Sequence, residues 1–194
     1  MSNSKETRAR ILDEAFALVR ERGAGAVTIA EIATAAGVSR QLVYVHFANR
    51  AGLLVAMARH HDVRSGFADR TRDAAGLPAP AAFEALVRAW LDYLPEILPV
   101  AQALEAAVIT GEDGAEAWRD RMTALRETFR AAVERLDEAD ALAGGWTIDT
   151  AADWAWARCH PSVWRELVAE RGWEPEEYAR RATASIVAEI IANV

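Results

Sequence analysis

The sequence predicts an all-α protein, in which an N-terminal three-helix helix-turn-helix domain precedes a C-terminal helical bundle. Apolar residues recur at intervals of three and four along almost the whole chain, and no segment of any length alternates polar with apolar residues. Two helix caps flank a glycine within a short stretch near the N-terminus. Residues 73–80, DAAGLPAP, are the clearest break in the helical pattern and predict a loop.

The first helix is expected to run from Lys5 to Arg22, with Asn3 or Ser4 as its cap and Gly23 at its end. Its apolar stripe would rest against the helix-turn-helix, where we expect Phe16 and Phe47 to be partners in the core. The residues of this stripe are Ile11, Leu12, Ala15, Phe16 and Val19.

The first helix of the helix-turn-helix begins with a capping box. Thr28 is followed three residues later by Glu31, so the hydroxyl can accept a backbone N–H while the carboxylate reaches back to the cap. Gly37 stands where a left-handed residue would end this helix after about two turns.

A second short helix is expected from Arg40 to about Val45, with Ser39 as its cap. Val43 and Phe47 would face inward at a spacing of four. The outer side of this helix would carry Arg40, Gln41, Leu42, Tyr44, Val45 and His46.

These outward side chains are of the types that read DNA. Arginine can bind guanine through two hydrogen bonds, glutamine can bind adenine, and small apolar groups can touch thymine methyl groups. A helix N-terminus and hydroxyl groups suit phosphates. The alternative is an ordinary surface helix pair, since arginine and glutamine on a helix usually meet only water.

The same stretch resembles the N-terminal pattern of TetR-family transcriptional repressors over about the first 60 residues. The matching positions are Thr28, Ile29, Ile32, Ala33, Ala36, Gly37, Val38, Ser39, Tyr44, Phe47, Arg50, Leu53 and Leu54. The resemblance implies a cytoplasmic homodimer that represses transcription at a palindromic operator in double-stranded DNA and is released by a small apolar or amphipathic effector. Two-fold symmetry would put two recognition helices roughly 34–36 Å apart.

We therefore expect a DNA-binding domain at 1–50, a linking helix at about 49–65, and an effector-binding and dimerisation domain at 66–194. His60, His61 and Asp62 are adjacent on the linking helix and cannot converge on a metal, so a linker surface or interdomain hydrogen bonds are expected there. Bases would be contacted by Arg40, Gln41, Leu42 and Val45. Phosphates would be contacted by Thr28, Ser39, Tyr44, His46 and Arg50.

Charge is distributed unevenly along the chain. The net charge is −7, yet residues 1–60 carry +3 and the remainder −10. A mildly basic N-terminal region followed by an acidic remainder is expected if only the N-terminal region contacts phosphates. The N-terminus is polar and lacks the apolar core of a signal peptide, and no apolar run reaches the length of a bilayer span, which favours the cytoplasm and no membrane partner.

The second domain is expected to be helical to its end. We expect helices at 81–94 and 100–110 separated by a link bounded by Pro95 and Pro99, a turn at 111–114, and a long helix at 115–136. Further helices are expected at 147–159, at 161–170 with Pro161 in the first turn, and from Pro175 onward.

All seven tryptophans lie after residue 89, and the family resemblance implies a ligand cavity among them. The alternative for each tryptophan is that it simply fills the core. The candidate pocket residues are Trp90, Tyr93, Gln102, Glu105, Trp118, Met122, Arg126, Phe129, Trp154, Cys159 and His160. Cys159 with His160 lacks the spacing of a metal site, and an inert buried thiol is the alternative to a redox sensor.

The last two helices offer more apolar surface than one side can bury, and the resemblance implies a four-helix dimer interface from this region. The candidate interface residues are Trp164, Leu167, Val168, Ile186, Val187, Ile190 and Ile191. No nucleotide-binding, metalloprotease or serine hydrolase motif is present, so neither an enzyme nor a cofactor or metal is expected. The remaining rival is a helical protein-interaction module without DNA binding.

Overall fold

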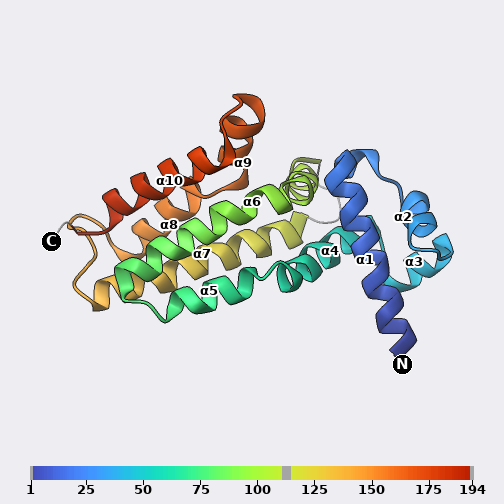
Figure 1. The fold of residues 1–194 in the computed structure, drawn as a ribbon, viewed down its shortest axis with the longest axis horizontal. Helices are drawn as coiled ribbons and strands as arrows, with labels where there is room; N and C mark the ends of the chain where they lie inside the picture. The colour runs from blue at the N-terminus through green and yellow to red at the C-terminus, as the bar shows by residue number, and fades with distance from the viewer. Residues whose placement is uncertain (1, 111–114, 193–194) are drawn as a thin grey trace. The chain divides into compact units, whose positions relative to one another are not determined.

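The computed structural model describes residues 2–110 and 115–192, and these residues are helical nearly throughout (Figure 1). No β-strand occurs among them; an isolated antiparallel bridge joins Leu142 to Ile191. The elements are α1 (Ser2–Arg22), η1 (Ala24–Ala26), α2 (Ile29–Ala35), α3 (Arg40–His46), α4 (Arg50–Arg64), α5 (Phe67–Ala75), α6 (Ala79–Thr110), α7 (Ala115–Glu138), α8 (Ile148–Arg158), α9 (Pro161–Trp164), η2 (Arg165–Glu170) and α10 (Pro175–Ile190). The predicted all-α class is confirmed.

The chain divides by its internal contacts into two compact units. The first unit consists of Met1–Ser65 and Glu96–Asp120. In it, α1 packs against η1, α2 and α4, and α2 packs against α3. The side chains that fill the centre of these N-terminal helices are fully buried, and they are Ile11, Leu12, Ile32, Leu53 and Met57. The linking helix α4 is therefore part of the same folded unit as the helix-turn-helix.

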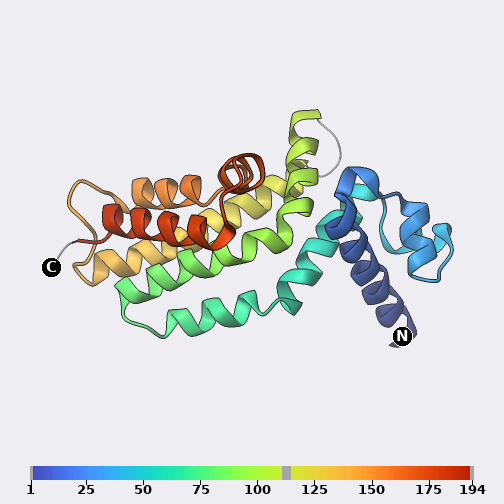
Figure 2. The same ribbon diagram turned by 45° about the horizontal axis from the view of Figure 1, so that its top comes forward.

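The second unit consists of Gly66–Pro95 and Arg121–Val194. Its helices α8 and α10 lie side by side in both ribbon views (Figures 1 and 2) and are in contact. The segment after α10 is hydrogen-bonded to the loop that follows α7: the Ala192 backbone N–H donates to the Ala141 carbonyl at 2.9 Å. The largest buried side chains of this unit include Phe83, Leu91, Tyr93, Leu94, Phe129 and Leu136.

The loop predicted at 73–80 is much shorter in the structure. Helix α5 continues to Ala75 and α6 begins at Ala79, so only Gly76–Pro78 lies outside the helices. Alanine favours helix, and Pro80 falls in the first turn of α6, where a missing N–H costs nothing. Helix α5 itself was missed, because its nine residues are mostly charged or small.

The break predicted at Pro95 and Pro99 is also wrong, because α6 runs through both prolines as one helix of 32 residues. A proline inside a helix costs about 3 kcal/mol through its lost hydrogen bond and its clash with the preceding turn. Apolar side chains on both sides of the prolines are buried, among them Leu94, Ile97 and Leu98, and their burial offsets that cost. The turn predicted at 111–114 lies outside the described residues.

The predicted end of the chain is largely confirmed. Thr147 caps α8, Pro161 stands in the first turn of α9, and Pro175 opens α10. The segment after α9 differs, since Arg165–Glu170 is a π-helix. Among residues 2–110 and 115–192, no helix combines the length and the apolar character needed to cross a bilayer.

Candidate functional site

The capping box at the start of α2 is formed as the sequence predicts. The Thr28 hydroxyl oxygen accepts the Glu31 backbone N–H at 3.2 Å, and the Thr28 backbone N–H donates to the Glu31 carboxylate at 2.8 Å. Arg22 also donates to Glu31 at 2.9 Å. These hydrogen bonds lower the pKa of Glu31 from 4.5 to about 2. The Thr28 backbone N–H has the largest effect, the Thr28 hydroxyl the next and Arg22 the third.

The turn after α2 depends on a left-handed glycine. Gly37 has a φ of 62°, and the Val38 backbone N–H donates back to the Ala33 carbonyl at 2.9 Å. Ser39 then caps α3, because its hydroxyl oxygen accepts the Leu42 backbone N–H at 3.1 Å. Local hydrogen bonds therefore define the turn and the start of α3.

The inner side of α3 is buried and its outer side is open. Val43 and Phe47 are buried, as predicted. Val45 is 73% exposed and Tyr44 42% exposed, an unusual state for large hydrophobic side chains. Arg40 and Gln41 are also exposed, whereas Leu42 and His46 are half-buried.

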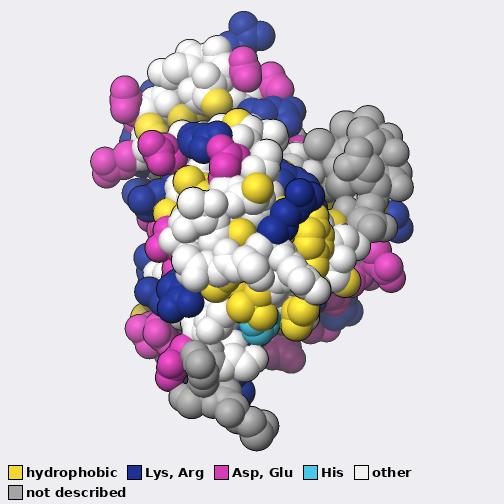
Figure 3. Space-filling model, turned by 90° about the vertical axis from the view of Figure 1, so that its right-hand side faces the viewer, with side chains coloured by type: hydrophobic (Ala, Val, Ile, Leu, Met, Phe, Trp, Pro, Cys, Tyr) yellow, Lys and Arg dark blue, Asp and Glu magenta, His cyan; other side chains and the backbone are white. Residues whose placement is uncertain are grey.

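Arg40 is partly ordered by its neighbour Tyr44. Its guanidinium carbon lies 5.7 Å from the centre of the Tyr44 ring, and its Nη2 donates to the Tyr44 hydroxyl at 3.5 Å. Figure 3 shows the face on which α2 and α3 are labelled at the right of Figure 1, and Lys and Arg side chains border uncharged and hydrophobic groups there. Such a surface offers donors and apolar contacts together.

Arg50 has a role that the sequence did not indicate. Its Nη1 donates to the Val27 carbonyl at 2.5 Å, and its Nη2 donates to the Ala24 carbonyl. The side chain therefore joins the start of α4 to the short helix η1. Arg50 was predicted to contact a phosphate, and in this structure its guanidinium is instead engaged with these two backbone oxygens.

Two arginines of α1 that sequence reasoning did not single out also support the helix-turn-helix. Arg10 Nε donates to the carbonyl of Ala36, which is the C-cap residue of α2, at 2.9 Å. The Arg8 guanidinium lies 5.0 Å from the centre of the Phe47 ring. The sequence does indicate this position for Arg8, because it comes three residues before Ile11 and four before Leu12 and so shares their side of the helix.

The histidine pair of α4 binds carboxylates within the first unit. His60 Nε2 lies 2.9 Å from Asp13 Oδ1, and Arg64 Nη1 lies 3.1 Å from Asp13 Oδ2. His61 Nε2 lies 3.0 Å from Glu96 Oε2, and its ring stacks on Phe16 with the ring centres 3.8 Å apart. Phe16 is thus a partner of His61. In the described part of the chain, no three His, Cys, Asp or Glu side chains are grouped to hold a metal.

Comparison with known proteins identifies the helix-turn-helix. Residues 11–57, which include α2, its glycine turn and α3, match the model of the bacterial regulatory proteins of the tetR family. This helix-turn-helix segment belongs to the TetR family. The HTH-type transcriptional repressor LfrR of Mycolicibacterium smegmatis is 36% identical over 95 residues, which are 48% of this chain and 49% of LfrR. The chain therefore spans about half the length of this curated relative in the match.

Solved structures of similar fold extend over the whole chain. NalD, the secondary repressor of the MexAB-OprM multidrug efflux pump in Pseudomonas aeruginosa, has a TM-score of 0.69 at 22% identity, with 100% of both chains covered. A protein from Saccharomonospora viridis, crystallised in complex with choline, has a TM-score of 0.81 at 19% identity and covers 97% of this chain and 100% of its own. At such identities the likeness shows the fold. TetR-family proteins are DNA-binding regulators, which supports the expectation that the chain is not an enzyme.

The residues predicted to line an effector pocket are distributed over both units. Gln102, Glu105 and Trp118 fall in the first unit and the other eight in the second. Trp90, Tyr93, Trp118, Met122, Phe129 and Cys159 are buried. Glu105, Arg126, Trp154 and His160 are half-buried, and Gln102 is exposed.

Trp90 and Tyr93 are the candidate pocket residues that the structure brings into one cluster. Their ring centres are 6.1 Å apart, and Phe67 of α5 lies against both, at 5.8 Å from Trp90 and 4.8 Å from Tyr93. Trp90 Nε1 donates to the Cys159 carbonyl at 2.8 Å. This bond satisfies a carbonyl at the end of α8, so Trp90 has a structural role. Burial raises the pKa of the Cys159 thiol, which keeps it protonated and unreactive.

Other members of the predicted set have surface roles. Arg126 pairs with Asp153, at 2.5 Å, and with Asp149 and Glu127. His160 caps α9 by accepting the Ser162 backbone N–H at 3.3 Å. Helical periodicity places these residues on the right helices but does not show that ion pairs and caps use their polar groups.

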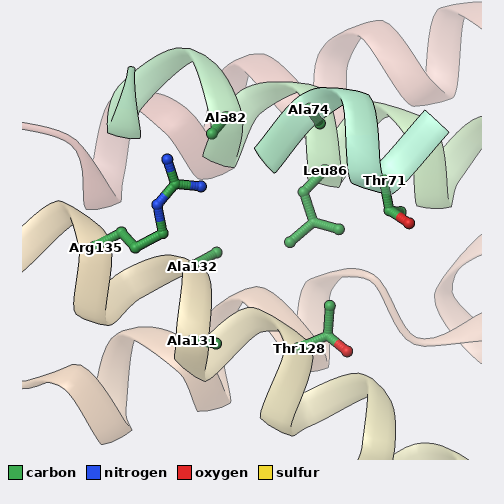
Figure 4. Close-up of a pocket in the computed structure, with 8 residues that line it drawn as sticks. All are labelled: Thr71, Ala74, Ala82, Leu86, Thr128, Ala131, Ala132 and Arg135. Atoms are coloured by element: carbon green, nitrogen blue, oxygen red, sulfur yellow. The ribbon is translucent and has the colours of Figure 1, made fainter. Parts of the chain in front are cut away.

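Two of the cavities that described residues line lie within the second unit, and neither is lined by a predicted pocket residue. The smaller, of about 190 Å³, lies between α5, α6 and α7 (Figure 4). Leu86 points into it, Thr71 and Thr128 flank it, and Arg135 lies at one end, where it donates to the Leu77 carbonyl at 2.9 Å. The larger is an open groove of about 630 Å³ between the end of α8, the π-helix η2 and α10.

The predicted dimer residues divide into an inner and an outer set. Trp164, Ile186 and Ile190 are buried inside the single chain, so they are not available to a partner. Leu167, Val168, Val187 and Ile191 are half-exposed. The correction follows from packing, because α8 and α10 contact each other and bury the inner face of α10 within the unit.

Proposed function

We propose that the protein is a homodimeric transcriptional repressor that binds a palindromic DNA operator and leaves it when a small apolar or amphipathic effector binds the second unit. Acting on the chromosome, it would work in the cytoplasm. The observation that carries the proposal is the outer face of α3. It combines exposed Arg40, Gln41 and Val45 on a helix whose start is fixed by a cap.

Arg40, Gln41, Leu42 and Val45 are the proposed base-reading residues. Their side chains provide a two-pronged donor, an amide and two aliphatic groups, which are the groups that distinguish base pairs in the major groove. Leu42 is half-buried, so its contact with a thymine methyl would be peripheral. The remaining four residues near α3 are proposed to position the helix on phosphates: Thr28, Ser39, Tyr44 and His46.

The hydroxyls differ in how freely they can donate to a phosphate. The Ser39 hydroxyl accepts the Leu42 backbone N–H, which leaves its own hydrogen for a phosphate oxygen. The Thr28 hydroxyl already donates to the Glu31 carboxylate at 2.8 Å. Thr28 would have to exchange that acceptor for a phosphate. Arg50 would likewise have to release the Ala24 and Val27 carbonyls, so we propose a positioning role for it in addition to a phosphate contact.

The proposed dimer is two-fold symmetric and uses the half-exposed residues of the last helices. Leu167, Val168, Val187 and Ile191 remain available, and exposed Ala184 and Ala188 on α10 would allow close approach of a partner helix. A dimer is needed because a single recognition helix reads too few base pairs to select one site in a genome. Sedimentation at micromolar concentration should therefore give twice the mass of one chain.

The proposed effector would bind among the helices of the second unit. LfrR and NalD are described as repressors, and the S. viridis protein was solved with choline. The choline complex supports a small-molecule partner without specifying which one this chain binds. A cavity of about 190 Å³ between α5, α6 and α7 is below the usual size of drug-like sites, about 300–1,000 Å³, so a larger guest would have to separate these helices. Release of DNA requires that the effector bind the released conformation more tightly.

The test is a fluorescence anisotropy titration of DNA from upstream of the protein's own coding region. The proposal predicts saturable binding to one fragment and a steep loss of affinity with added salt, because phosphate contacts release counterions. Arg40→Ala should reduce the preference for that fragment over random DNA. Binding to no fragment at low salt would contradict the proposal and favour a helical interaction module without DNA binding.

A further inference from the structure

The cavity between α5, α6 and α7 has the size of a single aromatic ring. Its volume is about 190 Å³, and an apolar cavity of about 150 Å³ is large enough to hold benzene. Four alanines, two threonines, Leu86 and Arg135 line it. We propose that this cavity binds a small carboxylate with a ring-sized apolar body, such as benzoate.

The cavity offers room for an apolar body because most of the side chains that line it are short. Ala74 and Ala82 are buried and Ala132 is half-buried, so no long side chain from these positions fills the space between the helices. Leu86 points into the cavity (Figure 4), where a ring would pack against it. A ring that enters removes apolar surface from water and gives the lining contacts that it lacks without a guest.

Arg135 is the hydrogen-bond donor that the lining offers to a guest. The Thr71 hydroxyl donates to the Phe67 carbonyl of its own helix at 3.1 Å. The Thr128 hydroxyl likewise donates to the Ala124 carbonyl at 2.9 Å. Alanine and leucine side chains have no polar atoms. A guest with an acceptor group therefore gains most when that group lies at the Arg135 end of the cavity.

The Arg135 guanidinium is held in place but is not neutralised. Its Nη2 donates to the Leu77 carbonyl at 2.9 Å, at one end of the cavity (Figure 4). Among the described residues no carboxylate forms an ion pair with it, and the neighbouring Glu134 pairs with Arg130 at 2.7 Å. Donors of the guanidinium remain for a second acceptor. A carboxylate is the best match, because charge-assisted hydrogen bonds are about twice as strong as neutral ones.

The cavity is separate from the surface that we propose for the dimer. In both ribbon views the first part of α6 and α7 lie between α5 and α10 (Figures 1 and 2). None of the residues that line the cavity is on α8, η2 or α10. A dimer formed through the last helices therefore does not use the residues of this cavity.

This inference deepens the proposed function, and it rests on that function in one respect: the carboxylate would be the effector. The size of the cavity favours a guest smaller than a drug-like molecule, because a ring-sized body enters without separating α5 from α6 and α7. Binding of the carboxylate itself can be measured on the protein without DNA. The site and the proposed function can therefore fail separately.

The test is calorimetric titration of the full chain with benzoate. Benzyl alcohol and benzylammonium are the neutral and cationic controls, because they carry the same ring. We expect one benzoate per chain, at least about tenfold weaker binding of benzyl alcohol, and no saturable binding of benzylammonium. The absence of saturable benzoate binding, or equal affinity for benzyl alcohol, would overturn the proposal.

Two variants of the lining locate the site. Arg135→Gln should weaken benzoate binding by about tenfold or more, because it removes the charged donor. Ala132→Leu should weaken it by a similar factor, because the longer side chain occupies the space of the ring. Arg70→Gln, at an exposed position of α5 outside the lining, is the matched control and should change nothing.

Each other pattern among the variants would contradict the site. Unchanged binding in both lining variants would place benzoate elsewhere. A loss in Ala132→Leu alone would show that the ring binds without the charge, and a loss in Arg135→Gln alone would place the anion outside the cavity. Circular dichroism shows whether each variant is folded. If one of them is not, the other variant and the comparison with benzyl alcohol decide.

An anisotropy titration of the upstream fragment with added benzoate separates the site from the proposed function. Benzoate should lower the affinity of the wild type for DNA and leave that of Arg135→Gln unaffected at the same concentration. An affinity unchanged by saturating benzoate would contradict its role as effector. If no fragment binds at low salt while benzoate binds as expected, the proposed function fails and the carboxylate site stands. If DNA binds and benzoate does not, the site fails and the proposed function stands.

Discussion

The outer face of α3 and the aromatic interior of the second unit hold their side chains in opposite ways. On α3, Val45 and Tyr44 are exposed, and among the described residues the side chain of Arg40 is hydrogen-bonded to Tyr44 alone. In the second unit, Trp90 is 4% exposed and its one polar atom is bonded to the Cys159 carbonyl. The difference teaches that α3 keeps exposed donors available to a partner, whereas Trp90 uses its donor inside the core.

Truncation of Trp90 should have the largest effect and concern stability alone. Trp90→Ala removes a buried indole and leaves the Cys159 carbonyl without its donor, so unfolding free energy should fall by about 3–5 kcal/mol. Urea denaturation measures this loss. Trp90→Phe retains most of the packing and should lose less; an alanine variant as stable as wild type would show that the indole is not part of a packed core.

Truncation of Arg40 should weaken DNA binding and leave the stability of the fold unchanged. Arg40→Ala should cost about 1–3 kcal/mol of operator affinity at particular base pairs and leave the melting temperature unchanged, because the side chain is exposed. Anisotropy titrations with operator variants measure the base dependence. Arg20→Ala, an exposed arginine on α1, is the control. A uniform loss on every sequence would contradict base reading by Arg40.

Arg50 lies between these extremes, because it is proposed both to touch phosphate and to hold η1. Arg50→Ala should weaken binding to all DNA sequences alike and also lower the melting temperature, since the Ala24 and Val27 carbonyls lose a charged donor worth about 1.5–3 kcal/mol. Arg50→Lys separates the two roles, because lysine keeps the charge and cannot bond both carbonyls in the same way. Losses that equal those of Arg40→Ala on every sequence would refute this division.

The smallest expected effect is on the thermal stability of the fold at acidic pH. Because the pKa of Glu31 is lower in the folded chain than its ordinary 4.5, its ionised capping box stabilises the fold above about pH 4.5. That contribution is lost as the pH falls from 4.5 towards 2. Thermal melts of wild type and Glu31→Gln should therefore differ more at pH 7 than at pH 3. A difference in melting temperature that does not change with pH would contradict an ionised Glu31 in the capping box.

The same comparison explains what could be predicted from the sequence. The helix-turn-helix depends on contacts between residues three or four apart, so Thr28, Gly37 and Ser39 identify it without any knowledge of tertiary structure. The continuity of α6 through Pro95 could not be predicted, because burial on both sides of the proline outweighs its local preference. Local rules therefore suffice where structure is locally determined.

The second unit depends on packing between distant residues, and its candidate sites were correspondingly hard to predict. Trp90 meets a carbonyl 69 residues away, and the groove draws residues from α8, η2 and α10 together. Periodicity identified the buried sides of these helices. It could not show that Ile186 would be covered within its own chain or that Trp173 would stay exposed.

The central claim is that α3, presented twice by a two-fold dimer, reads successive major grooves. The most direct test is a hydroxyl-radical footprint of the protein on its own upstream DNA. The account predicts two protected half-sites of opposite orientation, with centres separated by about one helical turn or a multiple of it, and loss of this pattern with Arg40→Ala. A footprint without two-fold symmetry, or one unchanged by Arg40→Ala, would contradict it.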